Sequence, residues 1–307
     1  MYDYVFFEIS GFCNAKCPWC VNRRGNLKQY NSRVIPPKEF EKAIDYMIEE
    51  SLIHDRSLLN LYNFGEPLMH PCLNEILHIL ADRNLCYTIS TNAFNYTDLD
   101  EKSVKNLKKF FISIPGFSQK SYDKIHGFDI KKILVNVDRW ISHFREKIQI
   151  QYHVYQFNLD EIGAASAYFK QKGVNFFPYL AYINDYQLAK SYLDRTLPQK
   201  MLDKALKELI LNHVEEQLMQ IPGSYTCPQH SILTIDEYCN VLTCCLLSKA
   251  DPDYSIGSLF ALSKEDIEEK KVNQRICIEC IQMGISTWVN SVSRPDFIKK
   301  FEYIPYP

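Results

Sequence analysis

Short runs of β-forming residues alternate with amphipathic helical stretches from residue 4 to about residue 180. Strand character occurs at residues 4–9, 58–62, 86–90, 110–114, 148–155 and 175–180. Helical spacing of apolar positions fills the intervals at residues 37–48, 73–82, 99–108, 130–144 and 161–172. Six strand–helix alternations predict an α/β fold with a parallel sheet and right-handed crossovers. Rolled up, this sheet is a partial (β/α)6 TIM-like barrel, with chemistry expected at the C-terminal ends of its strands.

The pattern changes beyond the predicted barrel. Residues 185–224 have helical character, with Leu202, Leu206 and Leu209 on one stripe. Farther on, a short strand pair at 231–235 and 240–243 surrounds a tight turn, and few apolar residues follow. Such a region needs a bound metal or docking on the barrel to be stable. We therefore expect a barrel at 1–184, a helical bridge at 185–224, a small metal-bound domain at 225–285 and a tail at 286–307.

Composition and charge exclude several classes of protein. The 307 residues are 46% hydrophobic and 23% charged, as in folded soluble domains, and the net charge of −2 provides no general field for a polyanion. No apolar run reaches the ~18 residues of a membrane span, and the start lacks the features of a signal peptide. We expect a cytoplasmic protein without nucleic-acid or membrane partners.

The cysteines are unusual in number and distribution. Of the eleven, Cys13, Cys17 and Cys20 lie within eight residues, and six more crowd the last third of the chain. Without a secretion signal, a disulfide framework is improbable and metal or redox chemistry is favoured.

The first cysteine group spells CxxxCxxC in the loop after the first predicted strand. Three thiolates on one short loop can hold three irons of a 4Fe–4S cluster and leave the fourth iron open for chemistry. A zinc site is the alternative, but zinc would need a fourth ligand, and His54 and His70 are distant in sequence.

With these cysteines, further motifs in order along the chain resemble the radical S-adenosylmethionine (SAM) superfamily. Asn63-Phe64-Gly65-Glu66-Pro67 is similar to the family's GGEP segment, which meets the methionine ammonium group through backbone carbonyls and the acidic side chain. Ser90-Thr91-Asn92 resembles its T-N-G segment near SAM, with Ala93 in place of Gly. The resemblance also suggests SAM contacts at Ser113, Gln151 and His153, and Trp19 beside the adenine, although Trp19 is equally explained as a packed aromatic.

The resemblance implies a shared first reaction. The cluster held by Cys13, Cys17 and Cys20 binds SAM, an external one-electron reductant such as flavodoxin or ferredoxin reduces it, and SAM is cleaved to a 5′-deoxyadenosyl radical. That radical removes a hydrogen atom from a substrate C–H bond.

A second cysteine group consists of Cys227, Cys244, Cys277 and Cys280. Four thiolates close either an iron–sulfur cluster or a tetrahedral zinc site, and spacing alone leaves both open. Behind such a barrel the arrangement resembles the twitch domain, a shortened SPASM domain that holds one auxiliary 4Fe–4S cluster. The choice between Cys244 and Cys245 as ligand is open, and turn spacing favours Cys244.

Two cysteines remain as candidates for catalysis. Cys239 occupies the turn between the two short strands, where the family usually has Gly, and Asn240 is an alternative for a left-handed position there. A thiol near a radical can return a hydrogen atom, so Cys239 and Cys245 are candidate hydrogen-atom donors in an epimerisation. Their alternative is the ordinary buried, inert cysteine.

These features favour an enzyme that epimerises or dehydrogenates a secondary alcohol carbon of a carbohydrate-like molecule. The chain begins at the first predicted strand, so we expect no fused leader-peptide-binding domain. The alternatives are a maturase that crosslinks or epimerises a ribosomally made peptide, a non-catalytic iron–sulfur electron carrier, and a zinc-stabilised binding module.

Overall fold

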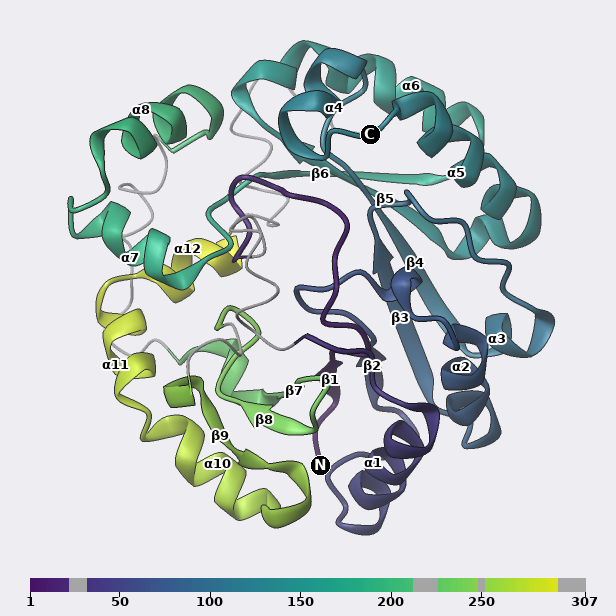
Figure 1. The fold of residues 1–307 in the computed structure, drawn as a ribbon, viewed down its shortest axis with the longest axis vertical. Helices are drawn as coiled ribbons and strands as arrows, with labels where there is room; N and C mark the ends of the chain where they lie inside the picture. Colours follow the sequence, from purple (N-terminus) through teal and green to yellow (C-terminus); the bar gives the residue numbers. More distant parts are fainter. Residues whose placement is uncertain (22–31, 212–225, 248–251, 292–307) are drawn as a thin grey trace. The chain divides into compact units, whose positions relative to one another are not determined.

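The computed structural model describes residues 1–21, 32–211, 226–247 and 252–291 (Figure 1). They form two compact units. The first contains residues 1–16, 21–111 and 228–274, and the second contains residues 17–20, 112–227 and the segment from Arg275 onward. Each unit is described separately below.

The first unit is built on a mixed sheet with strand order β3-β2-β1-β7-β8-β9. Its strands are β1 (Tyr4–Phe7), β2 (Leu58–Asn60), β3 (Cys86–Thr91), β7 (Ile232–Ile235), β8 (Asn240–Leu242) and β9 (Ser255–Ser258). β1 pairs in parallel with both β2 and β7, and β2 with β3, whereas β8 and β9 continue antiparallel. The parallel strands therefore end at one edge, where their loops meet.

Helices cover one face of this sheet and bury its apolar side chains. The helices of the first unit are α1 (Pro37–Glu49), α2 (Leu73–Asp82), α3 (Glu101–Lys105) and α10 (Lys264–Val272). Val5 and Phe7 are fully buried, and the ring of Phe7 lies 5.0 Å from that of Phe40 in α1. Side chains alternate along a strand, so Phe6 and Glu8 project from the opposite face.

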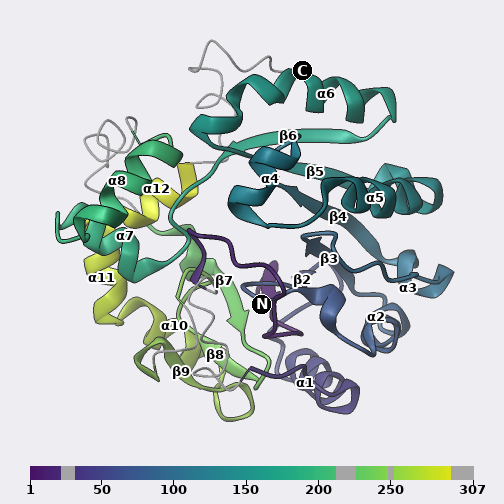
Figure 2. The ribbon, with the colours of Figure 1, turned by 45° about the horizontal axis from the view of Figure 1, so that its top comes forward.

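The second unit contains the parallel pair β5 (Ile148–Val154) and β6 (Asn175–Leu180), in register from Gln149 opposite Asn175 onward. α5 (Ile130–Phe144) and α6 (Ile162–Gln171) pack against this pair (Figure 2). The other helices described in this unit are α4 (Gln119–Ile125), α7 (Tyr186–Leu193), α8 (Gln199–Glu208), α11 (Arg275–Gln282) and α12 (Ile285–Ser291). β4 (Leu107–Ile114) runs from the first unit into the second.

Most predicted elements are confirmed, and the differences have local causes. The predicted helix at 99–108 ends at Lys105, because Leu107 begins the alternating buried pattern of β4. Helix α4 was not predicted; the Ser118 side chain caps it by accepting the Ser121 N–H. Among the described helices, none is long and apolar enough to cross a membrane.

The sequence predicted a small domain at 225–285 that is stabilised by a metal or by docking on the barrel. In the structure β7 pairs with β1, and residues 228–274 belong to the first compact unit. Within the second unit, α11 carries Cys277 and Cys280. Residues 212–224 of the predicted bridge and 292–307 of the predicted tail lie outside the described residues.

Candidate SAM and iron–sulfur site

Three loops at the carboxyl ends of β1, β2 and β3 bring predicted motif residues together in the first unit. The backbone N–H of Asn92 donates to Oε2 of Glu66 over 2.8 Å. The side-chain amide of Asn92 donates to Oδ1 of Asn14 over 2.7 Å and lies 4.0 Å from Sγ of Cys13. One asparagine thus connects the first cysteine of the CxxxCxxC loop to the acidic residue of the GGEP-like segment.

Glu66 is a buried carboxylate, 3% exposed. Oε1 accepts the Leu68 N–H over 3.1 Å and caps the 3-10 helix Pro67–Met69. Burial raises the pKa of Glu66 to about 7, and hydrogen bonds from Asn92, Thr91 and Leu68 oppose this shift. A cation beside Glu66 would stabilise its charged form, so the group is suited to meet an ammonium.

The Phe64–Gly65 segment packs tightly against the end of β1. A Cβ on Gly65 would lie 1.7 Å from the carbonyl oxygen of Ser10, so only glycine fits. Glu8, 2% exposed, accepts the Phe64 N–H over 2.8 Å and also the Gly65 N–H. Glu8 was not predicted as a site residue; its signal in the sequence is a carboxylate at the end of an apolar strand.

The loop after β3 has a left-handed residue where the family motif has glycine. Ala93 has φ = 61°, and its N–H donates to Oγ1 of Thr91 over 3.0 Å. This conformation explains the preference for glycine at that position of the T-N-G segment. Ser90 is half-buried near the end of β3.

In the second unit, Trp19 anchors the Cys17–Cys20 turn. The indole is 2% exposed, and its Nε1–H donates to Oε2 of Glu208 in α8 over 3.0 Å. The carbonyl of Trp19 accepts the Asn184 N–H over 2.7 Å. Trp19 therefore has the environment of a packed aromatic, and Glu208 is a partner that the sequence did not indicate.

His153 and Gln151 lie half-buried on one face of β5, alternating with buried Ile150 and Tyr152. His153 Nε2 and the Tyr179 hydroxyl are 2.5 Å apart, and burial lowers the pKa of His153 to about 4. Imidazole is therefore neutral near pH 7 and can accept or donate a hydrogen bond.

Farther upstream, Ser113 is half-buried on β4.

The pKa of Tyr155 is raised well above its usual value. Burial is the largest cause, the nearby Cys17 is the next, and Cys20 makes a smaller contribution. Tyr155 follows β5, so this strand of the second unit ends near the Cys17–Cys20 turn.

Cys244 and Cys245, both in the first unit, differ in their environments. A hydrogen bond from Cys245 is the largest of the effects that lower the pKa of Cys244 to about 7. The Cys244 sulfur also accepts the Leu246 N–H over 3.2 Å, whereas the Cys245 thiol contacts Oε1 of Gln229 at 3.2 Å. Cys244 therefore has thiolate character near pH 7, which a metal ligand requires.

The other predicted ligands of the second group lie in the second unit. Cys227 is buried, and Cys277 and Cys280 are half-buried about one turn apart on α11. Within the described ranges, no three His, Cys, Asp or Glu side chains are grouped as ligands of a metal ion. Both cysteine ligand sets remain predictions.

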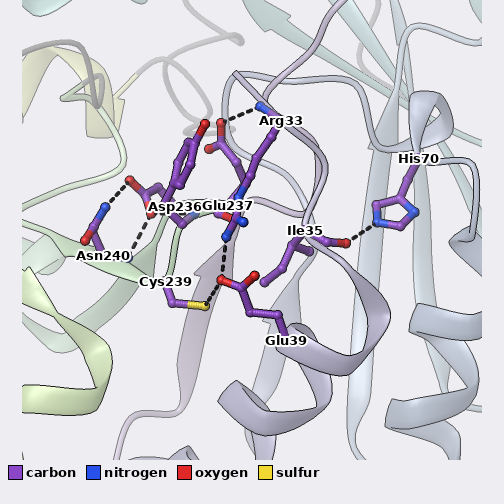
Figure 3. Close-up of polar contacts among 9 residues, drawn as sticks. Arg33, Ile35, Glu39, His70, Asp236, Glu237, Cys239 and Asn240 are labelled. Carbon is purple, nitrogen blue, oxygen red and sulfur yellow. Dashed lines mark hydrogen bonds and ion pairs between the residues drawn. The ribbon is translucent and has the colours of Figure 1, made fainter. Parts of the chain in front are cut away.

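Cys239 lies in the β7–β8 turn and is packed against α1 (Figure 3). It adopts the left-handed conformation itself, with φ = 60°, so the alternative that assigned this position to Asn240 is wrong. The Asp236 carboxylate accepts the N–H of Asn240 over 2.8 Å and stabilises the turn. Sγ lies 3.9 Å from Oε1 of Glu39, and burial followed by the Glu39 charge raises the pKa of Cys239 to about 12.

The donors present fit SAM and an iron–sulfur cluster. Among the described residues, Nδ2 of Asn14 and Nδ2 of Asn63 are buried without a hydrogen-bond partner. Both amides belong to the predicted motifs, and a carboxylate or a cluster sulfide would satisfy such donors. The half-buried thiols of Cys13, Cys17 and Cys20 are the ligands that cluster irons accept.

A sequence model described as the radical SAM superfamily matches residues 7–156. This range runs from the end of β1 to just beyond β5 and includes the CxxxCxxC loop and the loops after β2 and β3. The chain therefore contains a radical SAM superfamily domain.

Individual relatives are distant. A GTP 3′,8-cyclase of Clostridium botulinum (strain Okra) is 23% identical over 152 residues, which are 48% of this chain and 46% of that protein. A Methanocaldococcus jannaschii protein named as a glycyl-radical enzyme activating enzyme is 22% identical over 142 residues, 46% of this chain and 51% of its own length. The chain thus spans about half the length of these relatives.

Among solved structures, Streptococcus suis SuiB bound to its precursor peptide SuiA aligns with a TM-score of 0.58 and 13% identity. The alignment covers 87% of this chain and 64% of SuiB. At this identity the likeness shows a shared fold.

Proposed function

We propose that this protein is a radical SAM enzyme that uses SAM and two 4Fe–4S clusters to remove a hydrogen atom from a substrate C–H bond. The observation that supports this most directly is the contact of three motif loops in the first unit. Asn92 joins Glu66 to the Cys13–Asn14 segment through contacts of 2.7–4.0 Å. An iron–sulfur electron carrier has no use for this acidic segment.

Each motif has a role in this proposal. Cys13, Cys17 and Cys20 would hold the SAM-binding cluster, and Glu66 would meet the SAM ammonium. When bound, SAM and the reduced cluster supply the 5′-deoxyadenosyl radical. Gly65 and Pro67 maintain the shape of the Glu66 loop. The remaining contacts to SAM are assigned to Ser90, Asn92, Ser113, Gln151 and His153. Trp19, expected beside the adenine, is 2% exposed and donates to Glu208, so for it the packed-aromatic alternative is favoured.

For the second cluster we propose the twitch-type ligand set Cys227, Cys244, Cys277 and Cys280. The lowered pKa of Cys244 supports it over Cys245 as the ligand. Of these proposed ligands, Cys244 belongs to the first compact unit, and Cys227, Cys277 and Cys280 belong to the second.

The proposed reaction is epimerisation or dehydrogenation at a secondary alcohol carbon of a carbohydrate-like molecule. On the sheet face opposite α1, Phe6, Tyr62 and Phe111 form a chain of ring contacts, with centroids 5.7 and 6.3 Å apart. Asn60 and Thr88, hydrogen-bonded over 2.7 Å, share that face. Aromatic rings can pack against the C–H groups of a polyol, and neighbouring polar side chains can bind its hydroxyl groups. This sheet face therefore suits a polyol substrate.

Of the two candidate hydrogen-atom donors, Cys245 is favoured. It is close enough to Tyr62 to contribute to the raised pKa of that phenol, which burial chiefly causes. Cys239 instead contacts Glu39 of α1.

The test is anaerobic incubation of the reconstituted protein with SAM and dithionite, or with flavodoxin or ferredoxin as reductant, scoring 5′-deoxyadenosine. Wild type should form it, and Cys13→Ala, Cys17→Ala and Cys20→Ala should not. Cys86→Ala, which changes a half-buried cysteine outside both ligand sets, is the matched control and should retain formation. Wild type without 5′-deoxyadenosine would instead support the electron carrier, and zinc without iron or sulfide would support the binding module.

Substrate class is decided by which compounds stimulate SAM cleavage. Carbohydrates and aminocyclitols should increase 5′-deoxyadenosine formation, and peptides should not. If only peptides stimulate the cleavage, the carbohydrate proposal is replaced by that of a peptide maturase. The structure of SuiB, which is bound to a precursor peptide, is the reason to include peptides in this test.

A further inference from the structure

We infer that Glu8 is a positioning residue for SAM, which it serves by orienting the backbone carbonyls of Asn63 and Phe64. This inference rests on the proposed function, because those carbonyls belong to the segment expected to meet the SAM ammonium. Glu8 itself is not proposed to touch SAM.

The geometry of the loop supports this role. Oε1 of Glu8 accepts the Phe64 N–H over 2.8 Å and the Gly65 N–H as well. Each of these N–H groups shares a planar trans peptide with the carbonyl of the preceding residue, and in such a peptide N–H and C=O point in opposite directions. Two N–H groups that converge on one carboxylate oxygen therefore direct the carbonyls of Asn63 and Phe64 away from Glu8.

The backbone on both sides of this contact is fixed by hydrogen bonds. Glu8 is 2% exposed, and its own N–H donates to the carbonyl of Ile235 in β7 over 2.9 Å. On the loop side, the Glu66 N–H donates to the Phe12 carbonyl over 2.7 Å. Two backbone N–H groups donate to one oxygen of this buried side chain, so Glu8 can fix the loop before SAM arrives.

The experiment measures SAM affinity by calorimetry on the anaerobically reconstituted protein. Glu8→Ala removes both acceptors, and the dissociation constant for SAM should rise about tenfold or more. Glu8→Gln keeps an amide oxygen as acceptor and should remain within about threefold of wild type. Asp236→Ala is the matched control for Glu8→Ala, because Asp236 is also buried and accepts two backbone N–H groups, and it should leave the affinity unchanged.

A SAM analogue without the α-amino group separates positioning from general loss of structure. Such an analogue cannot use the two carbonyls, so wild type and Glu8→Ala should bind it equally well. Equal SAM affinity of wild type and Glu8→Ala would overturn the inference, as would an equal loss for SAM and the analogue. If wild type itself binds no SAM, the proposed function fails, and this inference fails with it.

Discussion

Replacing Gly65 with alanine tests the tight packing of the GGEP-like loop against the end of β1. The new Cβ would lie 1.7 Å from the Ser10 carbonyl oxygen, 2.7 Å from the Ser10 carbonyl carbon and 3.0 Å from Oε1 of Glu8. Ordinary contact begins at 3.4 Å, so the two backbone segments must separate by about 1.7 Å. Neither contact at Ser10 involves a flexible side chain that could move aside.

This separation breaks specific hydrogen bonds. The Glu66 N–H would lose the Phe12 carbonyl, now at 2.7 Å, and the Gly65 N–H would lose Glu8. Overpacking costs ~1–3 kcal/mol, and each lost hydrogen bond costs ~0.5–1.5 kcal/mol. We expect the free energy of unfolding to fall by about 3 kcal/mol, which lowers the melting temperature by roughly 5 °C.

The assay is urea and thermal unfolding followed by circular dichroism. Gly163→Ala is the matched control: Gly163 lies near the start of α6, and an added Cβ there meets nothing within 4 Å. Alanine favours helix by up to ~1 kcal/mol, so this variant should be as stable as wild type or more stable. Equal stability of Gly65→Ala and Gly163→Ala would refute the packing argument.

Two further predictions concern Cys239 and Glu66. Because Cys239 has φ = 60°, Cys239→Val should lower the free energy of unfolding by about 2 kcal/mol or more, whereas Cys239→Gly should stay within about 1 kcal/mol of wild type. Urea titrations that rank valine above glycine would contradict this. Burial raises the pKa of Glu66 from 4.5 to about 7, so its stabilising effect is full below pH 4.5 and is lost as the pH rises to about 7. Relative to Glu66→Gln, wild type should lose on the order of 3 kcal/mol of unfolding free energy between pH 4.5 and 8, measured without SAM; parallel pH profiles would be the opposing result.

Much of the architecture follows from local pattern. Helical spacing predicted α2 and α5 with their observed bounds, and β6 was predicted residue for residue. A helix of this kind buries one stripe of side chains, and a strand buries every second side chain. Both periods can be recognised from residues close together in the sequence. The order of the strands and motif loops also indicated the edge at which Cys13, Glu66 and Asn92 meet.

Tertiary structure decided the contacts that join distant parts of the chain within each unit. Glu8 accepts hydrogen bonds from the N–H groups of residues more than fifty positions away in the sequence. The indole of Trp19 donates a hydrogen bond to Glu208, which is 189 positions away. The pairing of β7 with β1 likewise depends on the order of strands in the sheet, which alternation of side chains does not specify. Cys239 takes a left-handed conformation because the turn hydrogen bonds to Asp236 and packing on α1 outweigh the local preference for Asn or Gly. Sequence thus determined most of the elements, and the folded chain determined which buried polar groups hold the motif loops in place.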